Sequence, residues 1–292
     1  MDSQNQGRSI YRGAERQQQV RDWCTRRLEQ WSVPHRRDDV PSCVGSTHVV
    51  SLGSGSPTVV VVPGTNVSAA LLESLASVLA PTFSVLLLDL PGQPGLSAGH
   101  RPRRDRLAWY GRWLADVLAQ TIPDTAIVVG HSLGGAITLA CDSPRIAGRV
   151  LVSTAGLTRL IPGIGVMRAT IPWMLGPTPA RSTALLRHFF APGHTPPPHL
   201  VEWYTLIARA CRTSLAPPVL PSELLAQRTN VPRLVVTGRH DVFLPPRRLR
   251  GPAGRRLGAD LTVIPGAGHM VTDEQPQSLA SLISAMSAPA PG

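Results

Sequence analysis

The chain has 292 residues, 42% of them hydrophobic, which is enough for one large domain with a sizeable core. Its formal net charge is +11, and all of its basic residues are arginine. No run of 18 apolar residues occurs, so the sequence predicts no transmembrane helix and no membrane partner. The polar start, Met1–Gln6, lacks the apolar centre of a signal peptide, and we therefore expect a cytoplasmic location.

Helix and strand patterns alternate along most of the chain. Apolar residues recur at helical spacing through residues 14–31, which predicts an amphipathic N-terminal helix that covers the core. The run Thr58–Val62 is entirely β-branched and is typical of a strand buried on both faces of a sheet. Similar reasoning predicts strands at residues 47–52, 83–88, 126–129, 149–153, 233–237 and 261–264, and helices at 68–80 and 105–120. The alternation predicts the α/β class, with a mostly parallel central sheet flanked by helices.

One segment interrupts this alternation. Residues 157–231 contain no clear strand and are rich in proline and aromatic residues. A structureless loop of that length is uncommon inside a compact domain, so we predict a helical cap inserted into the core. The predicted organisation is an N-terminal helix and first strand region at 1–46, a core at 47–156 and 232–287, the cap at 157–231, and a tail at 288–292.

The cysteines and the glycine motifs argue against metals and nucleotides. The four cysteines are scattered, and no Cys or Cys/His spacing suits zinc, so we expect free and mostly buried thiols. The sequence contains neither a phosphate-binding P-loop nor a GxGxxG motif after the first strand. We therefore predict no metal and no cofactor.

Two arginine clusters stand out, one within residues 101–106 and one within residues 247–256. Neither is interleaved with aromatic residues as a platform for single-stranded nucleic acid would be, so no nucleic-acid partner is expected. Two interpretations stay open. The arginines form a solvated surface, or they form a landing site for an acidic carrier protein or a phosphate-bearing substrate.

The stretch Gly130–Gly135 follows a buried strand and opens an apolar helix. A nucleophile at such a turn needs a sharp bend, and side chains two residues before and after it would collide. Glycine at 130 and 134 avoids that collision, and Gly135 allows close packing of the helix on the strand. This is the physical content of the G-x-S-x-G elbow, in which Ser132 is the exposed nucleophile.

A catalytic serine also needs a base and an orienting acid, which in this kind of sheet follow in the order Ser, Asp or Glu, His. Asp241 follows one predicted strand, and His269 follows the last one. Both positions are carboxyl ends of parallel strands, where open α/β sheets place their chemistry. Asp124 and Glu274 are weaker candidates for the acid, because they precede the elbow strand and start a helix, respectively.

In this order the motifs resemble the α/β-hydrolase superfamily, in its cap-bearing esterase-like branch. The residues that carry the resemblance are Pro63–Asn66, Asp89–Gly92, Gly130–Gly135, Gly238–Asp241 and Gly268–His269, within a region from about Trp31 to Ala285. The combination is specific to the fold and says little about the substrate.

The resemblance implies a role for each of these residues. Ser132 is the nucleophile, His269 is the general base and then the general acid, and Asp241 holds the imidazolium. The backbone N–H groups of Leu133 and Thr65 form the oxyanion hole.

This chain departs from the family pattern at Pro63, where relatives usually carry histidine. The proline leaves the Thr65 donor in place but cannot brace the loop through a side-chain hydrogen bond. The Thr65 hydroxyl or Asn66 is then a candidate for an additional donor. The candidate substrate-contacting residues are Asn66, His131, Trp173, Trp203, Tyr204 and Phe243.

Together these features predict a serine hydrolase that cleaves a small-molecule carboxylic ester with an apolar acyl or aromatic group. Three alternatives stay open. One is a thioesterase, acyltransferase or cyclase that acts on a carrier-bound acyl chain. Another is a ligand-binding protein on the same scaffold, and a third is non-hydrolytic use of the same site. The sequence leaves the oligomeric state undetermined.

Overall fold

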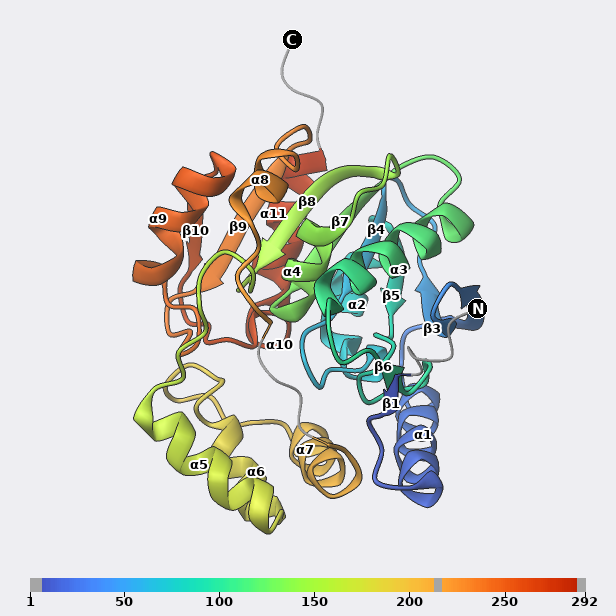
Figure 1. Cartoon of the computed structure of the whole chain (residues 1–292), viewed down its shortest axis with the longest axis vertical. Helices are drawn as coiled ribbons and strands as arrows, with labels where there is room; N and C mark the ends of the chain where they lie inside the picture. The colour runs from blue at the N-terminus through green and yellow to red at the C-terminus, as the bar shows by residue number, and fades with distance from the viewer. Residues whose placement is uncertain (1–6, 213–216, 288–292) are drawn as a thin grey trace.

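A computed structural model of the chain describes residues 7–212 and 217–287, so the predicted tail at 288–292 lies outside the described residues. An eight-stranded sheet runs through the molecule (Figure 1). In spatial order it contains β10 (Leu261–Ile264), β9 (Arg233–Gly238), β8 (Ile146–Val152), β7 (Ala126–His131), β4 (Thr58–Val62), β5 (Ser84–Leu88), β3 (Gly45–Leu52) and β2 (Arg36–Ser42). All neighbouring pairs from β10 to β5 are parallel, and β3 and β2 are antiparallel additions. The predicted α/β class with a mostly parallel sheet is confirmed.

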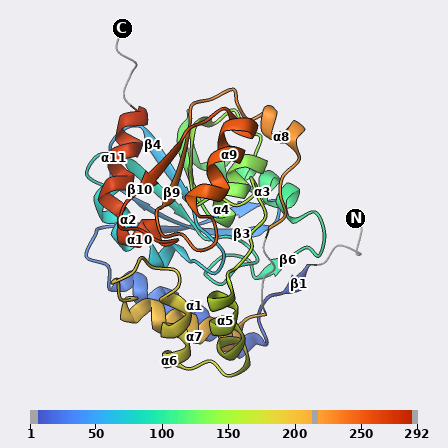
Figure 2. The same cartoon turned by 90° about the vertical axis from the view of Figure 1, so that its left-hand side faces the viewer.

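Helices cover both faces of this sheet, as the side view in Figure 2 shows. One face carries α3 (Arg106–Thr121), α4 (Leu133–Ala140), α8 (Ser222–Ala226) and α9 (Pro246–Leu257). The other carries α2 (Glu73–Leu79), α10 (Val271–Glu274) and α11 (Pro276–Ser287). Alternate residues of β4 explain this layering. Val59 and Val61 belong to one buried apolar cluster, while Val60 and Val62 belong to the other.

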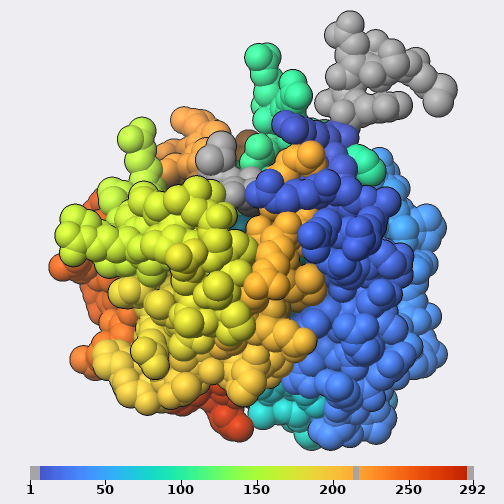
Figure 3. Space-filling model, turned by 90° about the horizontal axis from the view of Figure 1, so that it is seen from below, coloured from blue at the N-terminus to red at the C-terminus, as the bar shows by residue number. Residues whose placement is uncertain are grey.

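A third group of helices lies across one end of the sheet (Figures 1 and 3). It consists of α5 (Ile164–Leu175), α6 (Pro179–Leu186), α7 (Pro198–Ala210) and the N-terminal helix α1 (Ala14–Glu29). Helix α1 packs against α7, where Trp23 and Trp203 bring their ring centroids to 4.8 Å. Helix α8, which also lies within residues 157–231, packs against α9 beside the sheet. A short ribbon of β1 (Arg8–Ser9) and β6 (His100–Arg101) joins the start of the chain to the body.

Some elements differ from the sequence prediction. Strand β2 lies in the first strand region predicted within residues 1–46, but the sequence does not predict its bounds, because Arg36–Ser42 is charged and exposed and contains Pro41, as suits a protected sheet edge. The helix predicted at 68–80 is two pieces, the 3-10 helix η2 (Ala69–Leu71) and α2, which meet at Leu72. Strand β8 begins three residues before the predicted Arg149. All four cysteines are free, and only Cys43 of them is exposed.

Candidate active site

Ser132 occupies the turn between β7 and α4. Its backbone has φ 52° and ψ −111°, a conformation that L residues adopt only under constraint. The Ser132 N–H donates to the Val152 carbonyl at 2.9 Å, and its carbonyl accepts from the Ala155 N–H at 3.0 Å. The end of β8 therefore holds the strained turn in place.

The glycines around this serine allow chain segments to approach closely. A Cβ on Gly134 would overlap the carbonyl oxygen of Val62 in β4, and one on Gly130 would lie 2.6 Å from Thr138 Oγ1. A Cβ on Gly135 would overlap the side chain of Thr154. The close approaches that the sequence predicts at these glycines are therefore present in the structure.

The loop after β4 passes directly beside Ser132. A Cβ on Gly64 would stand 3.0 Å from His131 Nδ1 and 3.2 Å from Ser132 Cβ, so the backbone of this loop lies very close to the serine. The backbone N–H groups of Thr65 and Leu133 donate to no acceptor in the described part of the chain. Two amide donors close to Ser132 are therefore available to an outside acceptor.

Asp241 and His269 form a buried pair at the ends of β9 and β10. His269 Nδ1 lies 2.9 Å from Asp241 Oδ2, and the other carboxylate oxygen accepts from the N–H groups of Phe243 (2.8 Å) and Leu244 (2.9 Å). Burial alone would raise the pKa of Asp241. The charge and hydrogen bond of His269, together with the backbone donor, outweigh burial and lower it to about 2. The carboxylate is thus ionised at any ordinary pH and fixes the orientation of the imidazole.

His131, which directly precedes Ser132, supports the loop that carries His269. Its Nε2 lies 2.9 Å from the His269 carbonyl, to which it donates in the matching tautomer. Burial, with a contribution from the neighbouring His269, lowers the pKa of His131 to about 3. The ring is therefore neutral and acts as a hydrogen-bond donor between the elbow and the loop at the end of β10.

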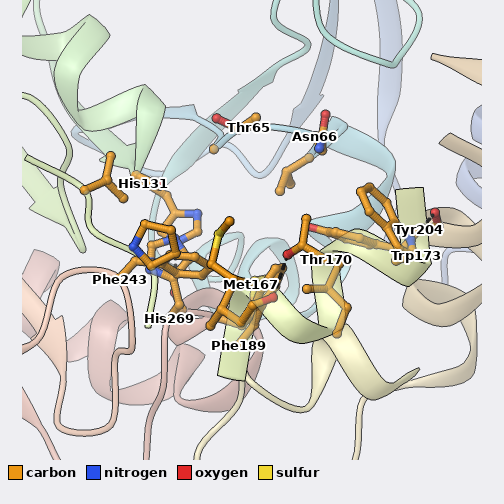
Figure 4. Close-up of a pocket in the computed structure, with 18 of the residues that line it drawn as sticks. Thr65, Asn66, His131, Met167, Thr170, Trp173, Phe189, Tyr204, Phe243 and His269 are labelled. Atoms are coloured by element: carbon orange, nitrogen blue, oxygen red, sulfur yellow. Dashed lines mark hydrogen bonds between the residues drawn. The ribbon is translucent and has the colours of Figure 1, made fainter. Parts of the chain in front are cut away.

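A cavity of about 270 Å³ lies between the sheet and the helices α5–α7. Its walls are largely apolar and include Val166, Met167, Leu185, Phe189 and Met270. In Figure 4, His131, Phe243 and His269 stand at one side, Trp173 and Tyr204 at the other, and Thr65 and Asn66 along one wall. Ser132 also lines this cavity. The arrangement can hold an apolar group close to a serine hydroxyl and an imidazole.

The sequence matches a known family over residues 59–282, and that family is described as the alpha/beta hydrolase family. The chain belongs to this family. The match confirms the predicted fold and the predicted serine-hydrolase type of enzyme. No curated protein matches the sequence of this hydrolase.

Solved structures of esterases share its fold. Carboxylesterase CesB from Bacillus subtilis has a TM-score of 0.76 at 17% identity, covering 94% of this chain and 98% of its own. Naproxen esterase from Bacillus subtilis has a TM-score of 0.76 at 20% identity, covering 93% of this chain and 96% of its own. Esterase RhEst1 from Rhodococcus sp. ECU1013 has a TM-score of 0.68 at 21% identity, covering 86% and 98%. The likeness therefore covers nearly the whole length of each of these proteins.

The structure brings most of the predicted site residues of this hydrolase together. Those that line the cavity are Thr65, Asn66, His131, Ser132, Trp173, Tyr204, Phe243 and His269. Asp241 lies behind His269, and Leu133 contributes its backbone at the start of α4. Trp203 corrects the expectation, because it is fully buried and does not line the cavity. Its Nε1–H donates to the Asn66 carbonyl at 2.7 Å, so it supports the cavity wall from behind.

Glu274 has a larger role in this hydrolase than the sequence indicated. Its carboxylate accepts from the Gly268 N–H (2.7 Å) and the Ala191 N–H (2.6 Å), and it lies 2.8 Å from His194 Nδ1. It therefore ties the loop that carries His269 to the segment after α6. The His269 N–H also donates to the Phe189 carbonyl in that segment, at 2.7 Å. No sequence signal identifies Ala191 and His194 as partners of Glu274, because they are about 80 residues away from it.

Neither a metal cluster nor a membrane span is found in the part of this hydrolase that the structure describes. No three His, Cys, Asp or Glu side chains gather there as a metal site would require. No helix there is long and apolar enough to cross a membrane.

Proposed function

We propose that this hydrolase cleaves carboxylic esters with an apolar acyl or aromatic group, through a covalent intermediate on Ser132. One observation carries the proposal. The serine of a strained strand–helix turn and the imidazole of a buried His–Asp pair line the same apolar cavity. The esterase names of the similar structures agree with it.

The reaction follows from the positions of these groups. His269 Nδ1 faces Asp241, which leaves Nε2 to take the proton from Ser132 Oγ as that oxygen attacks the ester carbonyl carbon. The Thr65 and Leu133 N–H groups stabilise the negative charge that develops on the carbonyl oxygen. His269 then gives its proton to the departing alcohol. A water molecule, deprotonated by His269 in the same way, attacks the acyl-enzyme, and His269 returns this proton to Ser132 Oγ as the acid is released.

The carrier-bound alternative has weaker support. In the arginine cluster at residues 247–256, Arg248 donates to the Ile161 carbonyl, and Arg256 donates to the carbonyl of Leu157. Each of these bonds engages part of a guanidinium group that keeps its charge, so the cluster is partly committed to contacts within the chain. A panel of esters and carrier-bound thioesters distinguishes the two substrate classes, since the carrier reaction would weaken steeply with added salt.

The proposal predicts a single covalent adduct. Intact mass after treatment with a small fluorophosphonate should rise by one adduct in the wild type and stay unchanged in Ser132→Ala. Hydrolysis of a short aryl ester should fall by roughly 10⁴-fold or more in the same variant. Ser74→Ala, a change at an exposed serine, is the matched control and should label and turn over like the wild type. An unlabelled but folded wild-type protein would exclude this mechanism and favour the ligand-binding alternative.

A further inference from the structure

The outer face of α5 exposes an apolar stripe. Within residues 7–212 and 217–287, the exposed large apolar side chains are Ile161, Ile164, Met167, Ile171, Met174, Leu175 and Val219. All except Val219 lie in or just before α5. From Ile161 to Met174 successive members are three or four residues apart, and Leu175 lies four residues after Ile171, which places them on one side of the helix. The opposite side is buried through Val166 and Trp173.

Packing within the chain does not explain this stripe. Single exposed apolar residues are normal on a protein surface, whereas a contiguous exposed patch marks an interaction site. Leu175 is 84% exposed and Ile164 is 75% exposed, so neither covers a neighbouring element. Figure 3 shows the α5–α6 part of this face open to the outside. The stripe is therefore available to a partner.

Within residues 143–201, which contain the stripe, every Asp, Glu, Lys or Arg position is an arginine. The sequence contains no Asp or Glu between Asp142 and Glu202. Arg168 stands within the stripe, one turn after Ile164. At the end of α5, Arg181 donates to the Gly176 carbonyl, and Arg209 donates to the Pro177 carbonyl.

At the other end of the stripe, Arg248 donates to the Ile161 carbonyl. None of these four arginines pairs with a carboxylate in the described part of the chain. Arginines thus stand at both ends of the apolar stripe and within it as a cationic fringe, and the fitting partner is apolar with anionic groups beside its apolar part.

The stripe is also continuous with the cavity. Met167 and Met174 belong to the exposed stripe and line the cavity as well. A partner on α5 would therefore lie beside the opening that leads to Ser132.

We propose that this α5 face docks the protein on an anionic lipid surface. The apolar stripe would enter the boundary between headgroups and acyl chains, and the arginines would contact lipid phosphates and carboxylates, as in helices that lie in the plane of a membrane. A second copy of the chain fits less well. A two-fold contact through this face would bring two cationic fringes together with no carboxylate between them.

This proposal differs from the sequence-based expectation of no membrane partner. That expectation rested on the lack of a spanning helix, and docking on a surface needs none. The proposal does not depend on the proposed function, because binding can be measured without turnover.

The test is co-sedimentation of the full chain with vesicles of phosphatidylcholine containing a third phosphatidylserine, and with vesicles of phosphatidylcholine alone. Wild type and Ser132→Ala should both bind the anionic vesicles, and less so at high salt. The combined change of Ile164, Ile171 and Leu175 to Gln should weaken binding at least tenfold. None of these three residues lines the cavity, so turnover of a soluble short ester should not change. Val219→Gln, at an exposed apolar residue outside α5, is the matched control and should bind like the wild type.

Three outcomes would overturn the proposal. One is a folded wild type that binds neither kind of vesicle. Another is a triple variant that binds as well as the wild type, which would place the contact elsewhere. The third is a wild-type dimer in light scattering that the triple variant converts to a monomer, without vesicle binding in either. If the triple variant does not fold, as judged by circular dichroism, the single change Leu175→Gln replaces it and should still lower binding measurably.

Discussion

At the scale of single residues, the site depends on a few polar atoms held at fixed positions. The backbone strain at Ser132 costs of the order of 1–3 kcal/mol, and the hydrogen bonds of Ser132 to the end of β8 help to maintain it. Hydrogen bonds of His131 and Glu274 likewise help to hold the general base in position. Each binds a backbone group of the loop that carries His269. The position of the imidazole is thus set by contacts from the elbow, from α10 and from Asp241.

The buried His131 predicts how stability changes with pH. Its pKa is about 3 in the folded protein and about 6.5 in the unfolded chain. Between these values the unfolded chain binds one proton more, so the contribution of His131 to the free energy of unfolding falls as pH falls below about 6.5. The slope is at most about 1.4 kcal/mol per pH unit, and the contribution is constant above about pH 6.5. His131→Gln keeps a donor of similar reach but cannot titrate.

Urea unfolding of wild type and His131→Gln at several pH values between about 7.5 and about 5 measures this difference. The stability advantage of the wild type over the variant should shrink as the pH is lowered through that range. Two curves that run parallel over the whole range would contradict a neutral buried His131.

At the scale of elements, the crossing of α4 over the sheet depends on missing side chains. Helix α4 approaches β4 and β7 closely because Gly130 and Gly134 carry no Cβ. Helix α9 contains a glycine in open surroundings, since a Cβ on Gly254 would meet nothing within 4 Å. Gly134 and Gly254 therefore allow the same Gly→Ala change to be compared in tight and in open surroundings.

Gly134→Ala should lower the free energy of unfolding by about 1–3 kcal/mol, because the new methyl group overlaps the Val62 carbonyl. Gly254→Ala should raise it by up to about 1 kcal/mol, because alanine is the better helix former. Denaturant unfolding of both variants measures the two effects. Similar changes in both would mean that helix propensity, and not close packing, decides the effect at the elbow.

At the scale of the whole molecule, the N-terminal helix belongs to the same assembly as the predicted cap. Trp23 of α1 packs on Trp203 of α7, and Trp203 in turn donates to the Asn66 carbonyl at the cavity wall. Trp31 follows α1, and its Nε1–H donates to the Ala70 carbonyl in the 3-10 helix η2. Trp23 therefore supports the cavity wall through Trp203, and Trp31 connects the end of α1 to the core.

Trp23→Ala and Trp31→Ala should each lower the free energy of unfolding by about 3–5 kcal/mol, because both side chains are buried. Only Trp23→Ala should also raise KM for an apolar ester severalfold, since it loosens the support behind Asn66. Thermal unfolding and steady-state kinetics of both variants measure these effects. An equal rise of KM in both would show that lost stability alone affects the site.

The sequence by itself determined the features that depend on neighbours along the chain. The uninterrupted apolar run of β4 predicts a strand buried on both faces, and the glycines around Ser132 predict the sharp turn. The order of Ser132, Asp241 and His269 at strand ends predicts that they lie at one edge of the sheet, because parallel strands end there together.

The tertiary structure alone decided what lies between distant segments. It placed Trp203 behind the cavity wall, joined α1 to α7, and connected Glu274 to Ala191. It also left one side of α5 exposed, which its apolar sequence does not indicate. Periodicity reports that a side chain is apolar and which side of a helix it occupies. Its partner depends on how segments many residues apart pack together, and no local pattern encodes that.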